Sequence, residues 1–190
     1  MRLRENASAG WIVKAVACGG CAVVGLWIIG LFLGALFAPM RIIGQSATCQ
    51  SNVFHLARAF RMYADDYEDH VPPTAGWMDR TFFFVNQERY LHCPAVGQTG
   101  EKEYGYAMNT KTGGKDRAQI DRPDETPIVY DSTDMARNAA DPVSSLPRPG
   151  RHRTKSRKAS PSMPGNMIGF VSGNARIVLD KTEQTSRQPR

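Results

Sequence analysis

CQSNVFHLARAFRMYADDYEDHVPP, residues 49–73, has the apolar periodicity of one helix followed by two prolines. Its apolar side chains recur at alternating spacings of three and four residues from Cys49 to Tyr67, which places them on one face of an α-helix. The two prolines at its end cannot continue the helical hydrogen-bond ladder. The stretch therefore predicts an amphipathic helix at 39–70, with its apolar face packed on a domain.

An uncharged stretch precedes this helix. The 23 residues from Ala15 to Phe37 carry no charged side chain, and as a helix they would measure about 34 Å, enough to cross a hydrocarbon core. We therefore expect a transmembrane helix at 15–38. The alternative is a cleaved signal peptide, although its apolar region would be shorter and would end at a small-x-small site. The transmembrane and amphipathic parts form either one helix or two helices that meet at Pro39.

The charges beside this span predict its orientation. Arg2, Arg4 and Lys14 precede it, whereas only Arg41 follows it closely. The positive-inside rule then makes residues 1–14 a cytoplasmic tail and puts the rest of the chain outside.

The remaining chain predicts a β-rich part at 71–180. Its clearest signal is NMIGFVSGNARIVL, residues 166–179, in which two β-rich runs flank a turn. Residues 134–165 are rich in Pro, Ser and Arg and predict a long loop, and residues 181–190 predict a disordered tail. We expect an α+β fold, with the long N-terminal helix packed on a small antiparallel sheet.

The positive charge of the chain is local. The formal net charge is +6 at pH 7, but residues 148–158 alone contribute six basic side chains and no acid. A nucleic-acid-binding domain should spread its positive charge over a face. We therefore expect no nucleic-acid partner.

Several motifs in order along the chain carry a family resemblance. They include LHCPA at 91, YGYAMN at 104, and Arg151-His152 ahead of GFVSGNARIV. In the helix, the matching residues are Cys49, Asn52, Leu56, Ala59, Tyr63, Asp66 and Tyr67. The chain resembles the prepilin-like, type II secretion pseudopilin-related proteins of planctomycetes and similar bacteria. It departs from them in having no acidic residue in the apolar span and in having Ser172-Gly173-Asn174 where an Asp-Gly turn belongs.

The resemblance implies a pilin-like fold in the bacterial inner membrane, with the C-terminal domain outside the cytoplasm. The expected function is a non-catalytic structural or accessory subunit of an envelope or secretion assembly. Its expected partners are the lipid bilayer and other pilin-like subunits, through the N-terminal helix, with no small-molecule substrate. The alternative is a monomeric membrane-tethered module that binds an anionic polymer or lipid through a basic loop.

Cysteines 49 and 93 are the disulfide candidates. Cys49 lies on the apolar stripe of the helix, and Cys93 lies in a segment expected to cover that stripe. In an oxidising compartment such a pair closes a disulfide if the two Cα atoms come within about 7 Å. The alternative is two buried free thiols. Cys18 and Cys21 have redox spacing, but no further ligand lies near them in the sequence, and we expect no chemistry there.

Two charged clusters complete the candidate sites. No cofactor other than calcium is expected. The candidate calcium site is formed by the acids at the helix end: Asp65, Asp66, Glu68 and Asp69. The basic loop is the candidate partner- or anion-binding site: Arg148, Arg151, His152, Arg153, Lys155, Arg157 and Lys158. For both clusters, the alternative is a solvated surface. No nucleophile stands in a recognisable catalytic motif with a histidine, so no catalytic residues are predicted.

Overall fold

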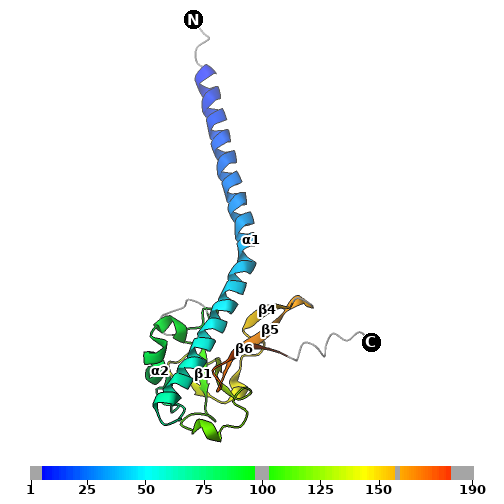
Figure 1. The fold of residues 1–190 in the computed structure, drawn as a ribbon. Helices are drawn as coiled ribbons and strands as arrows, with labels where there is room; N and C mark the ends of the chain where they lie inside the picture. Colours follow the sequence, from blue (N-terminus) through cyan, green and yellow to red (C-terminus); the bar gives the residue numbers. More distant parts are fainter. Residues whose placement is uncertain (1–5, 97–102, 157–158, 181–190) are drawn as a thin grey trace, which may run out of the picture. The chain divides into compact units, whose positions relative to one another are not determined.

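The computed structural model of the protein describes residues 6–96, 103–156 and 159–180, with the side chains of 23–35, 43–96, 103–153 and 163–180. The chain divides into two compact units, Met1–Arg41 and Ile42–Arg190. Helix α1, Asn6–Asp66, contributes residues to both units (Figure 1).

In the first unit, the described side chains belong to residues 23–35 of α1, and all the large apolar ones are exposed. Thirteen helical residues rise about 20 Å, less than the roughly 30 Å of a hydrocarbon core. No helix in the described part of the chain is both long enough and apolar enough to cross a membrane. This finding contradicts the predicted transmembrane helix at 15–38, and with it the predicted fold class and inner-membrane localisation. The side chains of 15–22 and 36–38 lie outside those described.

In the second unit, α1 buries the apolar face that its periodicity predicts. The stripe consists of residues that are at most 6% exposed: Cys49, Val53, Leu56, Phe60 and Tyr63. The first four of them pack with buried side chains of the sheet, among them Met108 and Val129, in one hydrophobic core. Tyr67, the last member of the predicted stripe, is 53% exposed because α1 ends at Asp66 and the chain turns through Glu68 and Asp69, both with positive φ.

The sheet of this unit has six strands. They are β1 (Tyr106–Asn109), β2 (Pro127–Asp131), β3 (Ala140–Asp141), β4 (His152–Ser156), β5 (Ala159–Phe170) and β6 (Ala175–Leu179). The strand order is β3-β1-β2-β5-β4, and β6 also pairs with β5. β5 can hold three neighbours because its twelve residues pair in sections: its first part pairs with β4, and its later part pairs with β6 and β2.

Two features of the sheet differ from the sequence expectation. β3 runs parallel to β1, with Met108 opposite Ala140, so the sheet is mixed and the predicted purely antiparallel sheet is wrong. The segment 134–165, expected as a loop, contains β3, β4 and the first part of β5. β3 pairs with the distant β1, whereas β4 pairs with the first part of β5 close by in the sequence. The polar, proline-containing composition of these strands is not typical of β-structure, so it did not reveal them.

The predicted hairpin at 166–179 is confirmed. β5 and β6 pair antiparallel, with Met167 opposite Ile177 and Gly169 opposite Ala175. The turn between them contains Gly173 at φ 88°, a left-handed conformation that glycine adopts without steric cost.

Short helices close the ends of the sheet. They are α2 (Trp77–Val85), η1 (Glu88–Leu91), η2 (Arg117–Gln119) and η3 (Val143–Ser145), the last three of them 3₁₀-helices. The fully buried Trp77 anchors α2, because its ring stacks on Phe60 of α1 and its indole N–H donates to the carbonyl of Ala139 (2.9 Å). The residues just before Cys93, within the part predicted to be β-rich, form η1 instead of a strand.

Candidate functional site

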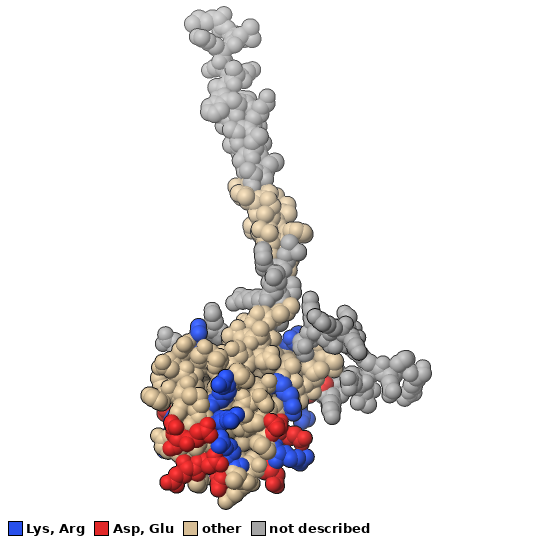
Figure 2. All heavy atoms as spheres, in the orientation of Figure 1, with Lys and Arg blue, Asp and Glu red and all other residues tan. Residues whose placement is uncertain are grey.

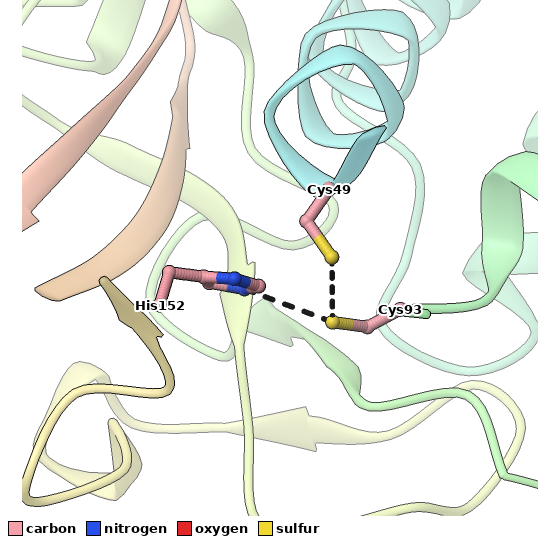
Figure 3. Close-up of side chains that lie close together, drawn as sticks. All are labelled: Cys49, Cys93 and His152. Atoms are coloured by element: carbon pink, nitrogen blue, oxygen red, sulfur yellow. Dashed lines mark hydrogen bonds between the residues drawn. The ribbon is translucent and has the colours of Figure 1, made fainter. Parts of the chain in front are cut away.

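Two cysteines and one histidine from distant parts of the chain meet in the core of the second unit (Figure 3). Cys49 comes from α1, Cys93 from the segment after η1, and His152 from the start of β4. The two Sγ atoms lie 2.9 Å apart, and Cys93 Sγ lies 3.7 Å from His152 Nε2. All three residues are at most 3% exposed. We call this set the Cys–His cluster.

Helix α1 carries Cys49 and also holds the segment with Cys93 in place beside it. Asn52 lies one turn beyond Cys49 and is buried. Its side-chain amide donates to the backbone carbonyls of His92 (2.9 Å) and Arg89 (3.3 Å). The N–H of Cys93 in turn donates to the carbonyl of Tyr104 (2.9 Å). The segment carrying Cys93 is thereby fixed against α1.

A buried ion pair borders the Cys–His cluster. Asp131, at the end of β2, is fully buried, and its Oδ2 lies 3.2 Å from His152 Nε2 and accepts the N–H of Met167 (2.6 Å). Arg151 places Nη1 3.6 Å from Asp131 Oδ1 and donates to the carbonyls of Gly105 (2.8 Å) and Ser132. The Asp131 carboxylate is therefore compensated by a guanidinium that is itself held by backbone carbonyls.

The ionisation of the Cys–His cluster follows from these contacts. The hydrogen bond from Cys49, with a further one from His152, lowers the pKa of Cys93 to about 5 despite burial. The hydrogen bond with Cys93, together with burial, raises the pKa of Cys49 far above its usual value. Burial alone would lower the pKa of His152, but its hydrogen bonds to Asp131 and Cys93 outweigh burial and raise that pKa to about 9. One thiolate is therefore stabilised at Cys93.

The geometry of the Cys–His cluster is unsuited to a Cys-His-Asp catalytic triad. In such a triad the nucleophile and the acid contact different ring nitrogens of the histidine. Here Cys93 and Asp131 both face Nε2, while Nδ1 of His152 is buried without a hydrogen-bond partner. The arrangement suits holding a structural bond or a bound ion.

The predicted disulfide partners are thus brought together, although the structure has them as free cysteines. A disulfide requires the sulfurs at about 2.05 Å, against the 2.9 Å found here. The disulfide stays a prediction.

The acids at the end of α1 bind an arginine. The guanidinium of Arg117 pairs with Asp65 (2.9 Å) and with Asp69, while Asp66 and Glu68 are exposed. Among the described residues, these four acids form no group close enough to hold a metal ion. The calcium prediction gains no geometric support, because the positive charge of Arg117 occupies the place of a cation between two of the carboxylates.

The basic loop is divided between the core and the surface. Arg151 and His152 point into the core, whereas Arg148 and Arg153 are exposed. The side chain of Lys155, and Arg157 and Lys158, lie outside what the structure describes. The predicted anion-binding set is therefore not one surface, since two of its members belong to the buried site.

Sequence reasoning missed Asp131 and the role of Arg151. Asp131 ends the apolar run PIVYD, in which an acid would ordinarily mark the exposed end of a strand. Arg151-His152 stood out only as part of a motif and of a charge run. A buried acid next to a histidine is visible only once β2 and β4 are placed around β5.

The chain matches no protein-family model, and the comparisons with curated proteins and with solved structures find no match. They give no evidence for a pseudopilin-like or type II secretion protein, and the family resemblance stays a prediction.

Proposed function

We infer that this protein is a non-catalytic structural or accessory subunit of a larger assembly, which it joins through residues 23–35 of α1. The observation that supports this inference is the exposure of nine large apolar side chains over that segment: Val23, Val24, Leu26, Trp27, Ile28, Ile29, Leu31, Phe32 and Leu33. In Figure 2 the described part of the segment shows no charged side chain. A helix that is apolar on every side is normally buried, and exposed apolar patches of this kind mark interaction sites.

The proposed partners are apolar helices of other subunits. Gly30 and Gly34 lie four residues apart on one helix face, and a Cβ added at either would meet nothing within 4 Å. Small residues at this spacing let a second helix backbone approach closely. The segment therefore combines a large apolar surface with a strip that suits helix–helix packing.

Burial of the Cys–His cluster supports a non-catalytic role. Its three side chains and Asp131 are at most 3% exposed, so a substrate has no route to the thiolate or the imidazole. Anion binding by the basic loop has less support, because Arg151 and His152 point into the core.

The test is photocrosslinking in cells with p-benzoylphenylalanine at Trp27, which is 69% exposed. Adducts with other protein chains are expected. The matched control places the same probe at Glu125, an exposed residue of the second unit, where no such adduct should form. Adducts with lipid alone, or none at Trp27, would overturn the proposed function.

A further inference from the structure

We propose that Cys49, Cys93 and His152, with Asp131 as fourth ligand, form a structural zinc site. The ligand atoms of the first three lie within 4.8 Å of one another, and Asp131 Oδ2 lies 3.2 Å from His152 Nε2. Two thiolates, an imidazole and a carboxylate are all ligands that Zn²⁺ accepts, and structural zinc sites are four-coordinate and closed. This proposal is independent of how the protein assembles.

Two of the distances between ligand atoms already suit a tetrahedral ion. With zinc–ligand bonds of about 2.0–2.3 Å, a sulfur and a nitrogen ligand should be about 3.6 Å apart, and a nitrogen and an oxygen ligand about 3.4 Å apart. The structure has 3.7 Å between Cys93 Sγ and His152 Nε2, and 3.2–3.3 Å between His152 Nε2 and the Asp131 oxygens. The two Sγ atoms, now 2.9 Å apart, must separate to about 3.8 Å. The Asp131 carboxylate must approach the sulfurs as well, because it lies outside the group of ligand atoms within 4.8 Å of one another.

The charges of the proposed zinc site also balance. Zn²⁺ and Arg151 contribute three positive charges, and two thiolates with the Asp131 carboxylate contribute three negative ones. The buried site is therefore neutral as a whole, which a low-dielectric core requires. On binding, the two thiols and the His152 imidazole lose whatever protons they still carry at the ligand atoms to solvent, and the ion forms two Zn–S bonds, one Zn–N bond and one Zn–O bond.

The surroundings favour this proposal over a plain disulfide. A disulfide needs neither the imidazole nor the carboxylate, yet the imidazole is buried against Cys93 and the carboxylate is buried against the imidazole. Metal-binding histidines usually direct their second nitrogen to a polar partner. Here Nδ1 of His152 is buried without a hydrogen-bond partner, so in the zinc-bound chain a water would have to supply that contact. The chemistry selects a borderline-soft ion over calcium or magnesium, which prefer oxygen ligands.

The test uses the full-length chain with Cys18→Ser and Cys21→Ser, which leaves Cys49 and Cys93 as the only cysteines. The chain is purified under reducing conditions, loaded with zinc chloride and freed of unbound metal by gel filtration. Elemental analysis should find about one zinc per chain. Both thiols should resist alkylation until a chelator is added, and zinc should raise the unfolding temperature by about 5–10 °C.

Substitutions then assign the ligands. Cys49→Ser, Cys93→Ser and His152→Ala should each abolish stoichiometric zinc, and Asp131→Asn should weaken zinc binding at least about tenfold. Co²⁺ should replace zinc and show the visible absorption of a tetrahedral thiolate site. His70→Ala is the matched control, because His70 is exposed and outside the cluster, and it should retain zinc.

Three outcomes would overturn the proposal. The first is a chain without zinc whose two thiols alkylate freely after loading. The second is a chain isolated as the Cys49–Cys93 disulfide even under reducing conditions. The third is zinc that His152→Ala retains in full. The first two outcomes are measured on the chain in which all four proposed ligands are unchanged. They therefore test the proposal even if a ligand variant fails to fold.

Discussion

The side-chain amide of Asn52 donates a hydrogen bond to the backbone carbonyl of His92, at 2.9 Å. This contact ties the residue preceding Cys93 to the turn of α1 that follows Cys49. Its position makes Asn52 the residue that brings the two thiols together, although Asn52 touches neither sulfur in any hydrogen bond of the structure.

Replacing Asn52 by Ala should therefore destabilise the second unit. The carbonyls of His92 and Arg89 would lose their side-chain donor in a partly buried region, at a cost of about 1–1.5 kcal/mol. Urea unfolding measures the change. The matched control is Gln50→Ala on the exposed face of α1, which should stay within about 0.5 kcal/mol of the parent. Equal stability of the two variants would contradict the assigned role.

Gly105→Ala should be among the most damaging small substitutions in the chain. Gly105 has φ 76°, and an added Cβ would lie 2.4 Å from Val96 Cγ2 and 3.0 Å from Arg151 Nη1. Strain and the displaced guanidinium together should cost about 2 kcal/mol or more in the free energy of unfolding.

Gly114→Ala separates strain from crowding. Gly114 has a similar φ, 70°, but an added Cβ would meet nothing within 4 Å. The free energy of unfolding of this variant should fall by only about 1 kcal/mol, which is the cost of the left-handed backbone alone. The prediction about Gly105 is wrong if the two alanine variants unfold at the same urea concentration.

The stability contributed by Asp79 should depend on pH. Hydrogen bonds from Asn138 and then Arg137 lower the pKa of Asp79 from its ordinary 3.8. Because the fold favours the ionised form, the contribution is fully present above pH 3.8 and is lost as the pH falls through the lowered pKa. Asp79→Asn should cost up to about 1 kcal/mol at pH 7, since the pair is largely exposed. Urea unfolding across the acid range should show this difference shrinking; a constant difference would contradict the cause.

In the zinc-free chain, the thiols of the Cys–His cluster should still form the predicted disulfide. Diamide would take two electrons and two protons from Cys49 and Cys93 and be reduced to its hydrazine. Closing the loop between residues 44 apart should stabilise the fold by about 3–4 kcal/mol in the chain-entropy model. Peptide mapping should find the cross-link, and zinc loaded beforehand should prevent it. If diamide leaves both thiols free in the metal-free chain, the disulfide prediction fails.

Packing of the apolar segment of α1 should be sensitive to one helix face. Gly30→Leu would fill the strip formed with Gly34, so the yield of protein adducts from the Trp27 probe should fall several-fold. Gly25→Leu is the control, because Gly25 has equally open space but lies on a different face of the helix. Equal loss of adducts in both variants would remove the Gly30–Gly34 face from the proposed function.

Sequence alone determined the features that depend on short-range periodicity. The three-and-four spacing of Cys49, Val53, Leu56 and Phe60 fixes one helix face, and the structure buries it. The hairpin at 166–179 could likewise be predicted, because strand propensity and a glycine turn are contained in fourteen consecutive residues.

Only the tertiary structure decided the site. Cys49, Cys93, Asp131 and His152 lie on four segments separated by about forty, forty and twenty residues, and no local pattern relates them. Arg151 and His152 looked like members of a surface charge run, yet the pairing of β4 with β5 turns them inward toward Asp131. The physical reason is that periodicity reports which face of an element is buried, whereas the partners it meets there depend on how the strands are ordered in the sheet.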